Sequence, residues 1–182
     1  KDFSSGKGGS AVTFLMGLEK VTYPEDLKWL AKKYGIEVEE TVESTENKEE
    51  ENHRESLMIV SGYAAKFFQD SLLDTDEGKS IGLSYFKERG FSNETIRKFE
   101  LGYSPDQWEA FSAQALKEGY AEEFIVESGL SVKRDNGTLY DRYRGRVMFP
   151  IHSFTGRVIA FGGRTLKNDK NVPKYVNSPE IE

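Results

Sequence analysis

The sequence predicts an α+β fold in which a run of helices precedes a small antiparallel sheet. Between residues 57 and 72, apolar side chains recur at intervals of three and four, which is the spacing of an amphipathic helix. After Gly129 the pattern changes to two strand-like runs, residues 146–151 and 157–161, with a short turn between them. A hydrophobic content of 37% and an aromatic content of 13% supply enough apolar material for a folded core.

The first forty residues are predicted to form a small module with two helices. A turn-rich loop over residues 4–10 leads into a short apolar helix over residues 11–16, for which Ser10 is the expected N-cap. A second helix begins at Tyr23, with Pro and Glu in its first turn, and Gly35 ends it. The loop also contains Gly-Lys-Gly-Gly, but the lysine precedes the last two glycines, unlike the order in a nucleotide-hydrolysing loop. A structural turn is therefore the favoured interpretation.

Residues 37–55 are strongly acidic. They hold nine acidic residues against Lys48 and Arg54, a net charge of −7. The alternating Asp or Asn ligands and the central Gly of a calcium-binding loop are missing. The sequence therefore predicts a solvated linker that runs into the long helix.

Four shorter helices are expected after the long helix ends near Leu73. They cover approximately residues 76–88, 92–99, 107–118 and 120–128. Ser92 is the expected N-cap of the helix over residues 92–99. Asp135–Asn136–Gly137 then predicts a tight turn ahead of the strand pair.

The overall net charge of −6 conceals a basic region. Residues 133–177 contain ten Lys and Arg residues against three Asp residues, a net charge of +7, which permits a polyanionic partner. The chain has no Cys and two His residues, which excludes disulfides, thiolate zinc sites and sites built from several histidines. No apolar run approaches the roughly 18–20 residues that span a bilayer. We expect a cytoplasmic protein with no membrane partner.

Arginines stand at every second position at the start of the predicted sheet, as Arg142, Arg144 and Arg146, with Tyr143 beside them. If a strand begins this early, the three side chains share one face. They could then follow a phosphate backbone while the tyrosine stacks on a base. They could equally be the charged edge of a sheet. The residues alone leave both interpretations open.

Two further segments carry groups suited to a ligand. Gly162 and Gly163 follow the second strand and would let a backbone approach a ligand closely, with Arg164 next to them. Near the end of the chain, Lys174, Tyr175 and Asn177 offer a cation, a stacking face and an amide. A plain surface loop is the alternative for both segments.

Several motifs in series resemble bacterial DNA primase of the DnaG type. The resemblance rests on Arg144–Ile151, Gly156–Arg164 and Lys174–Glu180. Tyr85–Phe91 and Phe99–Ser104 with the following proline are similar to the family as well, and so are residues 6–16 and 29–35. The order and spacing of these motifs fit over nearly all 182 residues.

The resemblance implies a division into domains. Residues 1–40 correspond to the C-terminal part of a zinc-binding-type module, 41–56 to an acidic linker and 57–182 to the N-terminal subdomain of the RNA polymerase core. The TOPRIM subdomain, whose acidic residues bind Mg or Mn, would follow Glu182. We therefore expect no catalytic residues in this chain, and expect the chain alone to be inactive.

The resemblance also puts the zinc site in question. Asp2 and Ser5 stand where the family usually has two zinc-ligand Cys residues. A carboxylate can bind zinc, but a serine hydroxyl is a poor ligand, and the soft thiolate pair is gone. We expect no stoichiometric zinc.

The family implies roles for the basic and polar residues singled out above. Template binding is expected of Arg89, Arg142, Arg144, Arg164 and Asn177, and nucleotide binding of Lys174 and Tyr175, whereas Arg146 supports the strand. The implied activity is synthesis of RNA primers from NTPs on single-stranded DNA template, with the replicative helicase bound through an absent C-terminal domain. The alternative is a non-catalytic single-stranded DNA-binding or partner-binding α+β module.

Overall fold

The computed structural model describes residues 23–36 and 45–181. The predictions for the loop over residues 4–10, the helix over residues 11–16, and Asp2 and Ser5 lie outside the described residues. The chain forms two compact units, residues 1–49 with 152–157 and residues 50–151 with 158–182. Each unit is described by itself.

The described part of the first unit contains the helix α2 (Tyr23–Tyr34), as the sequence predicts. Gly35 ends it with a positive φ of 65°, a conformation that suits glycine at a helix C-terminus. The backbone N–H of Ile36 donates to the carbonyl of Ala31 at 2.9 Å, which closes the last turn.

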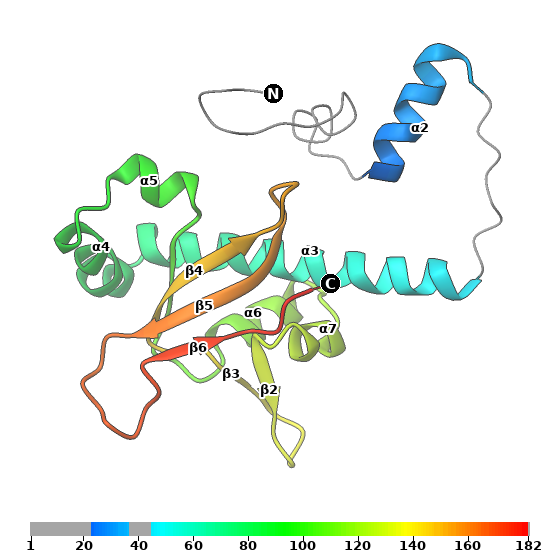
Figure 1. Ribbon diagram of the computed structural model, residues 1–182. Helices are drawn as coiled ribbons and strands as arrows, with labels where there is room; N and C mark the ends of the chain where they lie inside the picture. The colour runs from blue at the N-terminus through cyan, green and yellow to red at the C-terminus, as the bar shows by residue number, and fades with distance from the viewer. Residues whose placement is uncertain (1–22, 37–44, 182) are drawn as a thin grey trace. The chain divides into compact units, whose positions relative to one another are not determined.

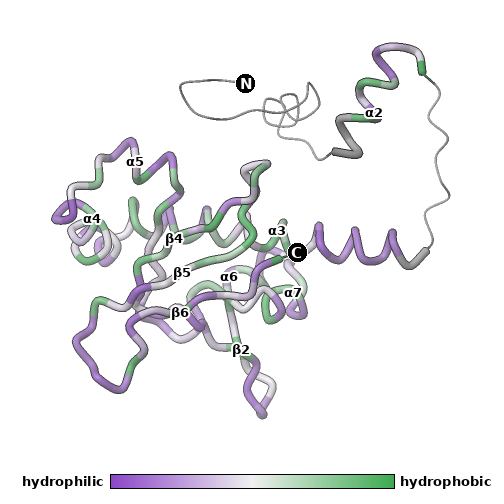
Figure 2. The backbone as a smooth tube through the Cα atoms, viewed as in Figure 1, coloured by the Kyte–Doolittle hydropathy of each residue, from purple (hydrophilic) through white to green (hydrophobic). Residues whose placement is uncertain are grey.

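The long helix α3 (Thr45–Asp74) begins twelve residues before the expected start at Leu57. Most of the predicted acidic linker, residues 41–56, is therefore helical from Thr45 onward. From Asn47 to Glu55 its residues are exposed, and this end of α3 is hydrophilic (Figure 2). Val60, Ala64 and Leu72 farther along are buried. Glu and Lys are good helix formers, so a helix fixed by its buried half extends through exposed acidic residues at little cost.

Five short helical segments follow α3, where the sequence predicts four helices. The π-helical segment η1 (Gly78–Leu83) runs directly into α4 (Ser84–Glu88), and the two together occupy the helix predicted over residues 76–88. A Cβ at Gly78 would lie 2.0 Å from the Ser71 carbonyl oxygen, so only glycine permits this close approach to α3. The remaining helices are α5 (Asn93–Lys98), α6 (Ala110–Lys117) and α7 (Glu122–Glu127). Ser92 caps α5 as predicted, since its Oγ accepts from Thr95 N at 3.0 Å.

A four-stranded sheet follows the order β1-β4-β5-β6, and Figure 1 shows β4, β5 and β6 side by side. Its strands are β1 (Gly102–Ser104), β4 (Arg146–His152), β5 (Val158–Thr165) and β6 (Tyr175–Asn177). The edge strands β1 and β6 both run antiparallel to their neighbours, with Tyr103 opposite Val147 and Val176 opposite Gly163. The sequence predicted the central pair β4 and β5 but neither edge strand.

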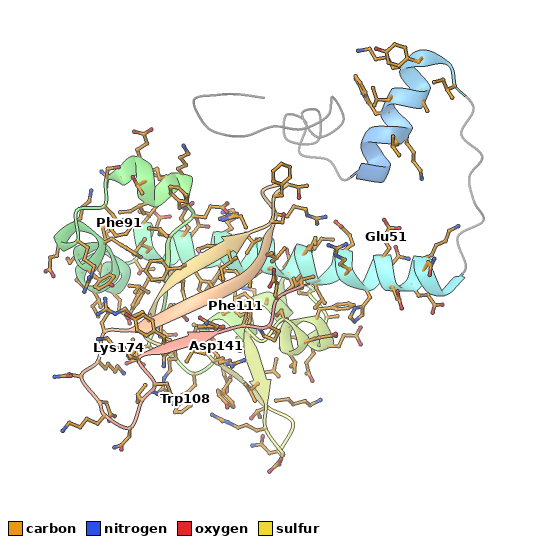
Figure 3. All side chains as sticks on the ribbon, viewed as in Figure 1. Glu51, Phe91, Trp108, Phe111, Asp141 and Lys174 are labelled. Carbon is orange, nitrogen blue, oxygen red and sulfur yellow. The ribbon has the colours of Figure 1, made fainter. Side chains whose placement is uncertain are left out.

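A separate antiparallel ribbon consists of β2 (Ser131–Lys133) and β3 (Leu139–Asp141). The predicted tight turn joins them, with Gly137 at φ 83° and Arg134 N donating to Thr138 O at 2.8 Å. The Asp141 carboxylate ties the ribbon to α6, because it accepts from Phe111 N at 2.7 Å and Ser112 N at 3.0 Å (Figure 3). Burial raises the pKa of this carboxyl, and the donated hydrogen bonds offset part of that rise.

The core of the second unit has two clusters, and α3 contributes to both. One gathers Val60, Ala64 and Phe68 of α3 with residues of α6, α7 and the sheet. The other gathers Leu72 with Phe86, Tyr103 and Val147. The sheet is therefore packed on α3 and the short helices, which fixes where its loops emerge. None of the described helices is long and apolar enough to cross a membrane.

Candidate nucleic-acid interface

An open cleft of about 530 Å³ lies between the segment η1–α4 and the end of β5 with the loop that follows it. We call it the α4–β5 cleft. Its lining includes three residues that the sequence analysis assigned to template or nucleotide, namely Arg89, Arg164 and Lys174. Lys167 adds a fourth cation, against the acidic Glu88 and Asp169, so the lining carries a net positive charge. The loop between β5 and β6 is hydrophilic along most of its length (Figure 2).

Tyr85 brings two of these arginines together in the cleft. The guanidinium carbons of Arg89 and Arg164 lie 4.8 Å and 4.9 Å from the centre of its ring, within the range of cation–π contacts. Arg164 Nη1 also donates to the Tyr85 hydroxyl. The ring centre of Tyr175, on the neighbouring strand β6, lies 5.8 Å from the guanidinium carbon of Arg164. Arg164 Nε is buried and makes no hydrogen bond within the described residues. These contacts fix the Arg164 side chain along the cleft wall.

A buried arginine supports the loop that carries Lys174. Arg146 is 5% exposed and donates to the carbonyls of Pro173 at 2.9 Å, Lys174 at 3.3 Å and Gly163 at 3.4 Å. Burial lowers the pKa of its guanidinium. The expected role of Arg146 in supporting the strand is confirmed, and its hydrogen bonds also hold the backbone on which Lys174 is mounted.

A second cluster lies around an exposed tryptophan, and we call it the Trp108 platform. Trp108 is 54% exposed, and the guanidinium carbon of Arg144 lies 3.6 Å from the centre of its ring. Arg134 lies 5.1 Å from the same ring, and Tyr140 meets it edge-on. An exposed aromatic face with flanking guanidinium groups is suited to stacking on a nucleobase while neutralising adjacent phosphates. Figure 3 labels Trp108 together with Lys174 of the cleft.

Asp106 connects the platform to the cleft. Its Oδ1 lies 3.1 Å from Arg144 Nε, and its Oδ2 pairs with Nζ of the cleft residue Lys167. Glu77 holds the backbone of Asp106, because its Oε1 accepts from Asp106 N at 3.0 Å and from the Tyr103 hydroxyl at 2.8 Å. Cations from two separate loops are thereby joined through one carboxylate.

The strand does not begin early enough for Arg142, Arg144 and Arg146 to share one face, which was one of the two interpretations left open by the sequence. Residues 142–145 make a turn in which Gly145 has φ 66°, and β4 begins only at Arg146. Tyr143 is 1% exposed and packs in the core, so it is not available to stack on a base. The side chains of Arg144 and Arg146 instead separate, one to the surface over Trp108 and one to the interior.

The remaining predicted site residues are distributed around these clusters. Arg142 is exposed, and the cleft lining does not include it. Asn177 is exposed on β6, paired with Gly162 of β5. Gly162 and Gly163 lie within β5 rather than after it, since this strand continues to Thr165. A Cβ at Gly163 would lie 2.4 Å from the Tyr143 ring, so this glycine serves close packing rather than approach by a ligand.

Tyr85, Trp108 and Asp106 are not among the site residues predicted from the sequence. The only signals were a Trp in the first turn of the helix predicted over residues 107–118 and a Tyr within a family-like motif. Whether an aromatic ring is exposed depends on tertiary packing, which a single sequence does not display.

Two other features of the described residues bear on the chemistry. A second open cleft, of about 630 Å³, lies against α3 and is lined by Asp70, Asp74 and Glu118 with Lys66 as its cation, so its charge disfavours nucleic acid. Within residues 23–36 and 45–181, no three His, Asp or Glu side chains are grouped so as to hold a metal ion.

Residues 67–182 match the family described as DNA primase catalytic core, N-terminal domain. A DNA primase of Halalkalibacterium halodurans is 42% identical over 180 residues, which covers 98% of this chain and 29% of that protein. The chain thus spans about 29% of the length of this curated relative.

Two solved structures are similar in both sequence and fold. One is described as the DnaG primase catalytic domain bound to ssDNA. It is 37% identical, with a TM-score of 0.64, covering 71% of this chain and 40% of that chain. The other is the Aquifex aeolicus primase with its zinc binding and RNA polymerase domains. It is 34% identical, with a TM-score of 0.60, covering all of this chain and 41% of that chain.

Proposed function

The chain belongs to the DnaG-type DNA primase family, and from that premise we propose that its parent protein synthesises short RNA primers on single-stranded DNA. In this proposal the chain supplies the surface that holds the template strand and the incoming NTP. We place the activity in the cytoplasm, with the replicative helicase as a partner of the parent protein.

The observation that carries the proposal is the gathering of Arg89, Arg164 and Lys174 in one open cleft. Guanidinium groups bind phosphate oxygens with directed, charge-assisted hydrogen bonds, and a lysine ammonium neutralises phosphate as a point charge. Such contacts position a strand without reading its sequence. A template that changes sequence at every step requires this kind of binding.

We assign the template to the side of the interface that includes the Trp108 platform. Arg144 and Trp108 offer a phosphate contact next to a stacking face, and Arg89 and Arg164 extend the positive surface along the α4–β5 cleft. Arg142 and Asn177 are exposed and add outer contacts in this assignment.

We assign the triphosphate of the incoming NTP to Lys174, with Tyr175 beside it. Lys174 lines the cleft. Its backbone carbonyl accepts a hydrogen bond from Arg146 Nη1 at 3.3 Å, so the backbone that carries the ammonium group is held in place. A fixed cation stabilises the negative charge of a triphosphate and orients its reacting phosphorus. Tyr175 is 63% exposed and available to pack on a base or sugar.

Primer synthesis requires divalent metal ions, which stabilise the attacking and leaving oxygens. The described residues do not offer a cluster that fits such ions. We propose that the Mg or Mn ligands, and with them the catalytic acids, belong to another part of the parent protein.

For residues 1–40 we propose the end of a zinc-binding-type module, with residues 57–182 as the core subdomain. Asp2 and Ser5 replace the expected thiolates, so metal analysis of the purified protein should find no stoichiometric zinc. One tightly held zinc ion per chain would contradict the expectation that this module has lost its zinc site.

A non-catalytic single-stranded DNA-binding module is the second candidate, and the lack of a metal cluster among the described residues favours it for the isolated chain. Primer synthesis separates the candidates. Activity is expected from the parent protein and not from residues 1–182 alone, whereas DNA binding is expected from both. A parent protein that binds DNA tightly yet makes no primers with Mg or Mn present would favour the second candidate.

A further inference from the structure

We propose that Asp106 is a built-in competitor of nucleic-acid phosphate, and that its charge limits how tightly the interface binds a strand. This inference deepens the proposed function and rests on it for the identity of the strand. Its first support is that one carboxylate is shared by two cations, Arg144 and Lys167, that come from different loops.

The position of Asp106 is fixed independently of the cations it binds. Its backbone N–H donates to Glu77, which also accepts from Tyr103. Its side chain lies against Gly145, where an added Cβ would come within 3.3 Å of its Cγ and Oδ1. A Cβ at position 145 would require this carboxylate to shift by a few tenths of an ångström. Asp106 is thus built into the junction of the platform and the cleft.

The chemistry of the contact is that of a phosphate contact. Arg144 directs an N–H of its guanidinium at a carboxylate oxygen, and Lys167 pairs with the other oxygen. The same donors would bind two oxygens of a nucleic-acid phosphate. A phosphate that reaches Arg144 and Lys167 must therefore displace the carboxylate or lie close to its negative charge.

The exposure of the group makes displacement feasible. The side chains of Arg144, Asp106 and Lys167 are 30%, 36% and 54% exposed, so none of these ions is locked in a dry interior. Ion pairs of this kind contribute little net stability, since water and salt compete with them. A strand carrying many phosphates can replace them, whereas a single small anion does so less readily.

The carboxylate also affects the stacking face. Arg144 lies over Trp108 while its Nε is paired with Asp106. Release of that pair frees the guanidinium to move from the indole ring toward a phosphate, which opens the ring to a base. Displacement of Asp106 would thus couple the phosphate contact to the stacking contact.

The test compares Asp106→Asn with the wild-type chain and with Asp70→Asn as the matched control. Asp70 pairs with Lys66 on α3 and lines the acidic second cleft, so its substitution removes the same charge and one ion pair elsewhere. Asp106→Ala is a second variant at the same site, and thermal unfolding confirms that each protein is folded. All four proteins also carry Trp29→Phe, which leaves Trp108 as the fluorescent indole.

Two probes are titrated. The first is a fluorescein-labelled oligothymidylate, followed by anisotropy, and the second is inorganic tripolyphosphate, followed by Trp108 fluorescence. We expect Asp106→Asn to tighten the binding of both probes by about three- to tenfold. This change lies within the free energy that two partly exposed ion pairs contribute. The log–log salt slope for the oligonucleotide should steepen by about 0.7 to 1.4, one or two phosphate contacts. Asp70→Asn should change affinity less than about twofold, since screening weakens a distant charge.

The outcomes separate the two proposals. Tightening of either probe by both Asp106 variants, beyond that of Asp70→Asn, supports the competitor role. If both Asp106 variants bind tripolyphosphate more tightly but none of the four proteins binds the oligonucleotide, Asp106 competes with phosphate as proposed, whereas the proposed function is contradicted. If the wild type binds the oligonucleotide with normal salt dependence but neither Asp106 variant tightens either probe, the competitor role is wrong. Weaker binding by the Asp106 variants also overturns it.

Discussion

The guanidinium carbon of Arg144 lies 3.6 Å from the centre of the Trp108 ring, although the two residues come from different loops and are 36 positions apart in the chain. The same guanidinium is also paired through its Nε with Asp106 Oδ1 at 3.1 Å. A cation and an aromatic face are therefore presented together at one surface point. This pairing suits a single strand, which exposes both phosphates and bases.

The first prediction concerns this pair. Arg144→Ala should weaken binding of a single-stranded oligonucleotide and reduce the log–log salt slope by about 0.7, because one phosphate contact is lost. Anisotropy titrations at several salt concentrations measure both quantities. Lys133→Ala is a suitable control, since Lys133 is a surface cation paired with Glu122. Equal losses in the two variants would mean that net charge alone governs binding.

The second prediction separates the nucleotide from the template. In the parent protein, Lys174→Ala should leave template affinity nearly intact and reduce primer synthesis, since it removes charge neutralisation at the triphosphate. Arg144→Ala should do the reverse at limiting template. Template affinity and primer yield are measured for both variants. Equal loss of template affinity in both, with unchanged synthesis at saturating template, would show that the whole surface is one template groove.

The third prediction concerns the buried guanidinium of Arg146. Arg146→Met keeps an unbranched stem but removes the guanidinium donors to the carbonyls of Gly163 and Pro173, whereas the Lys174 carbonyl keeps the hydrogen bond from Thr165 N. The free energy of unfolding should fall by about 2–4 kcal/mol, the cost of unpaired buried polar groups. Denaturant unfolding measures this value. The exposed Arg142 provides the control, and Arg142→Met should cost less than about 0.5 kcal/mol. A similar small cost for both would contradict the supporting role.

The fourth prediction is a pH dependence. Burial raises the pKa of Tyr143 from 10.0 to about 12, with Arg142 and other neighbours offsetting part of the rise. The folded protein therefore keeps a proton that the unfolded chain loses above pH 10. The contribution of Tyr143 to stability is complete below that pH and is lost as pH rises through the folded-state value.

The reference for this prediction is Tyr143→Phe, which has no ionisable group at the position. The difference in unfolding free energy between wild type and variant should fall by about 1.4 kcal/mol between pH 9 and pH 11, one unit of that shift. Urea unfolding of both proteins at each pH measures it. A difference that stays constant over this range would show that the phenol is not buried as described.

The sequence predicted those features that depend on local patterns. The buried stripe of α3 from Val60 to Leu72 follows from helical spacing of apolar residues. The cap at Ser92 follows from the chemistry of one side chain. The role of Arg146 in supporting the strand was foreseen through the family resemblance, because the residue lies within a matching motif.

Features that depend on distant packing were not predicted. The strands β1 and β6 have three residues each and exist because they pair with β4 and β5. The start of β4 at Arg146 was predicted, but whether the strand extends back through Arg142 and Arg144 was left open, and the turn that ends at Gly145 with a positive φ shows that it does not. The exposure of Trp108 and the shared carboxylate of Asp106 arise only when three separate loops meet.

The most direct test of the central claim is the salt dependence of single-stranded DNA binding by Arg89→Ala/Arg164→Ala, compared with the wild-type chain. Both arginines line the α4–β5 cleft and flank Tyr85. If the cleft holds the template backbone, the wild type shows a steep loss of affinity between about 50 and 200 mM salt, and the double variant loses affinity and about 1.4 units of log–log slope. Binding that ignores salt, or a double variant that matches the wild type in both affinity and slope, would contradict the claim.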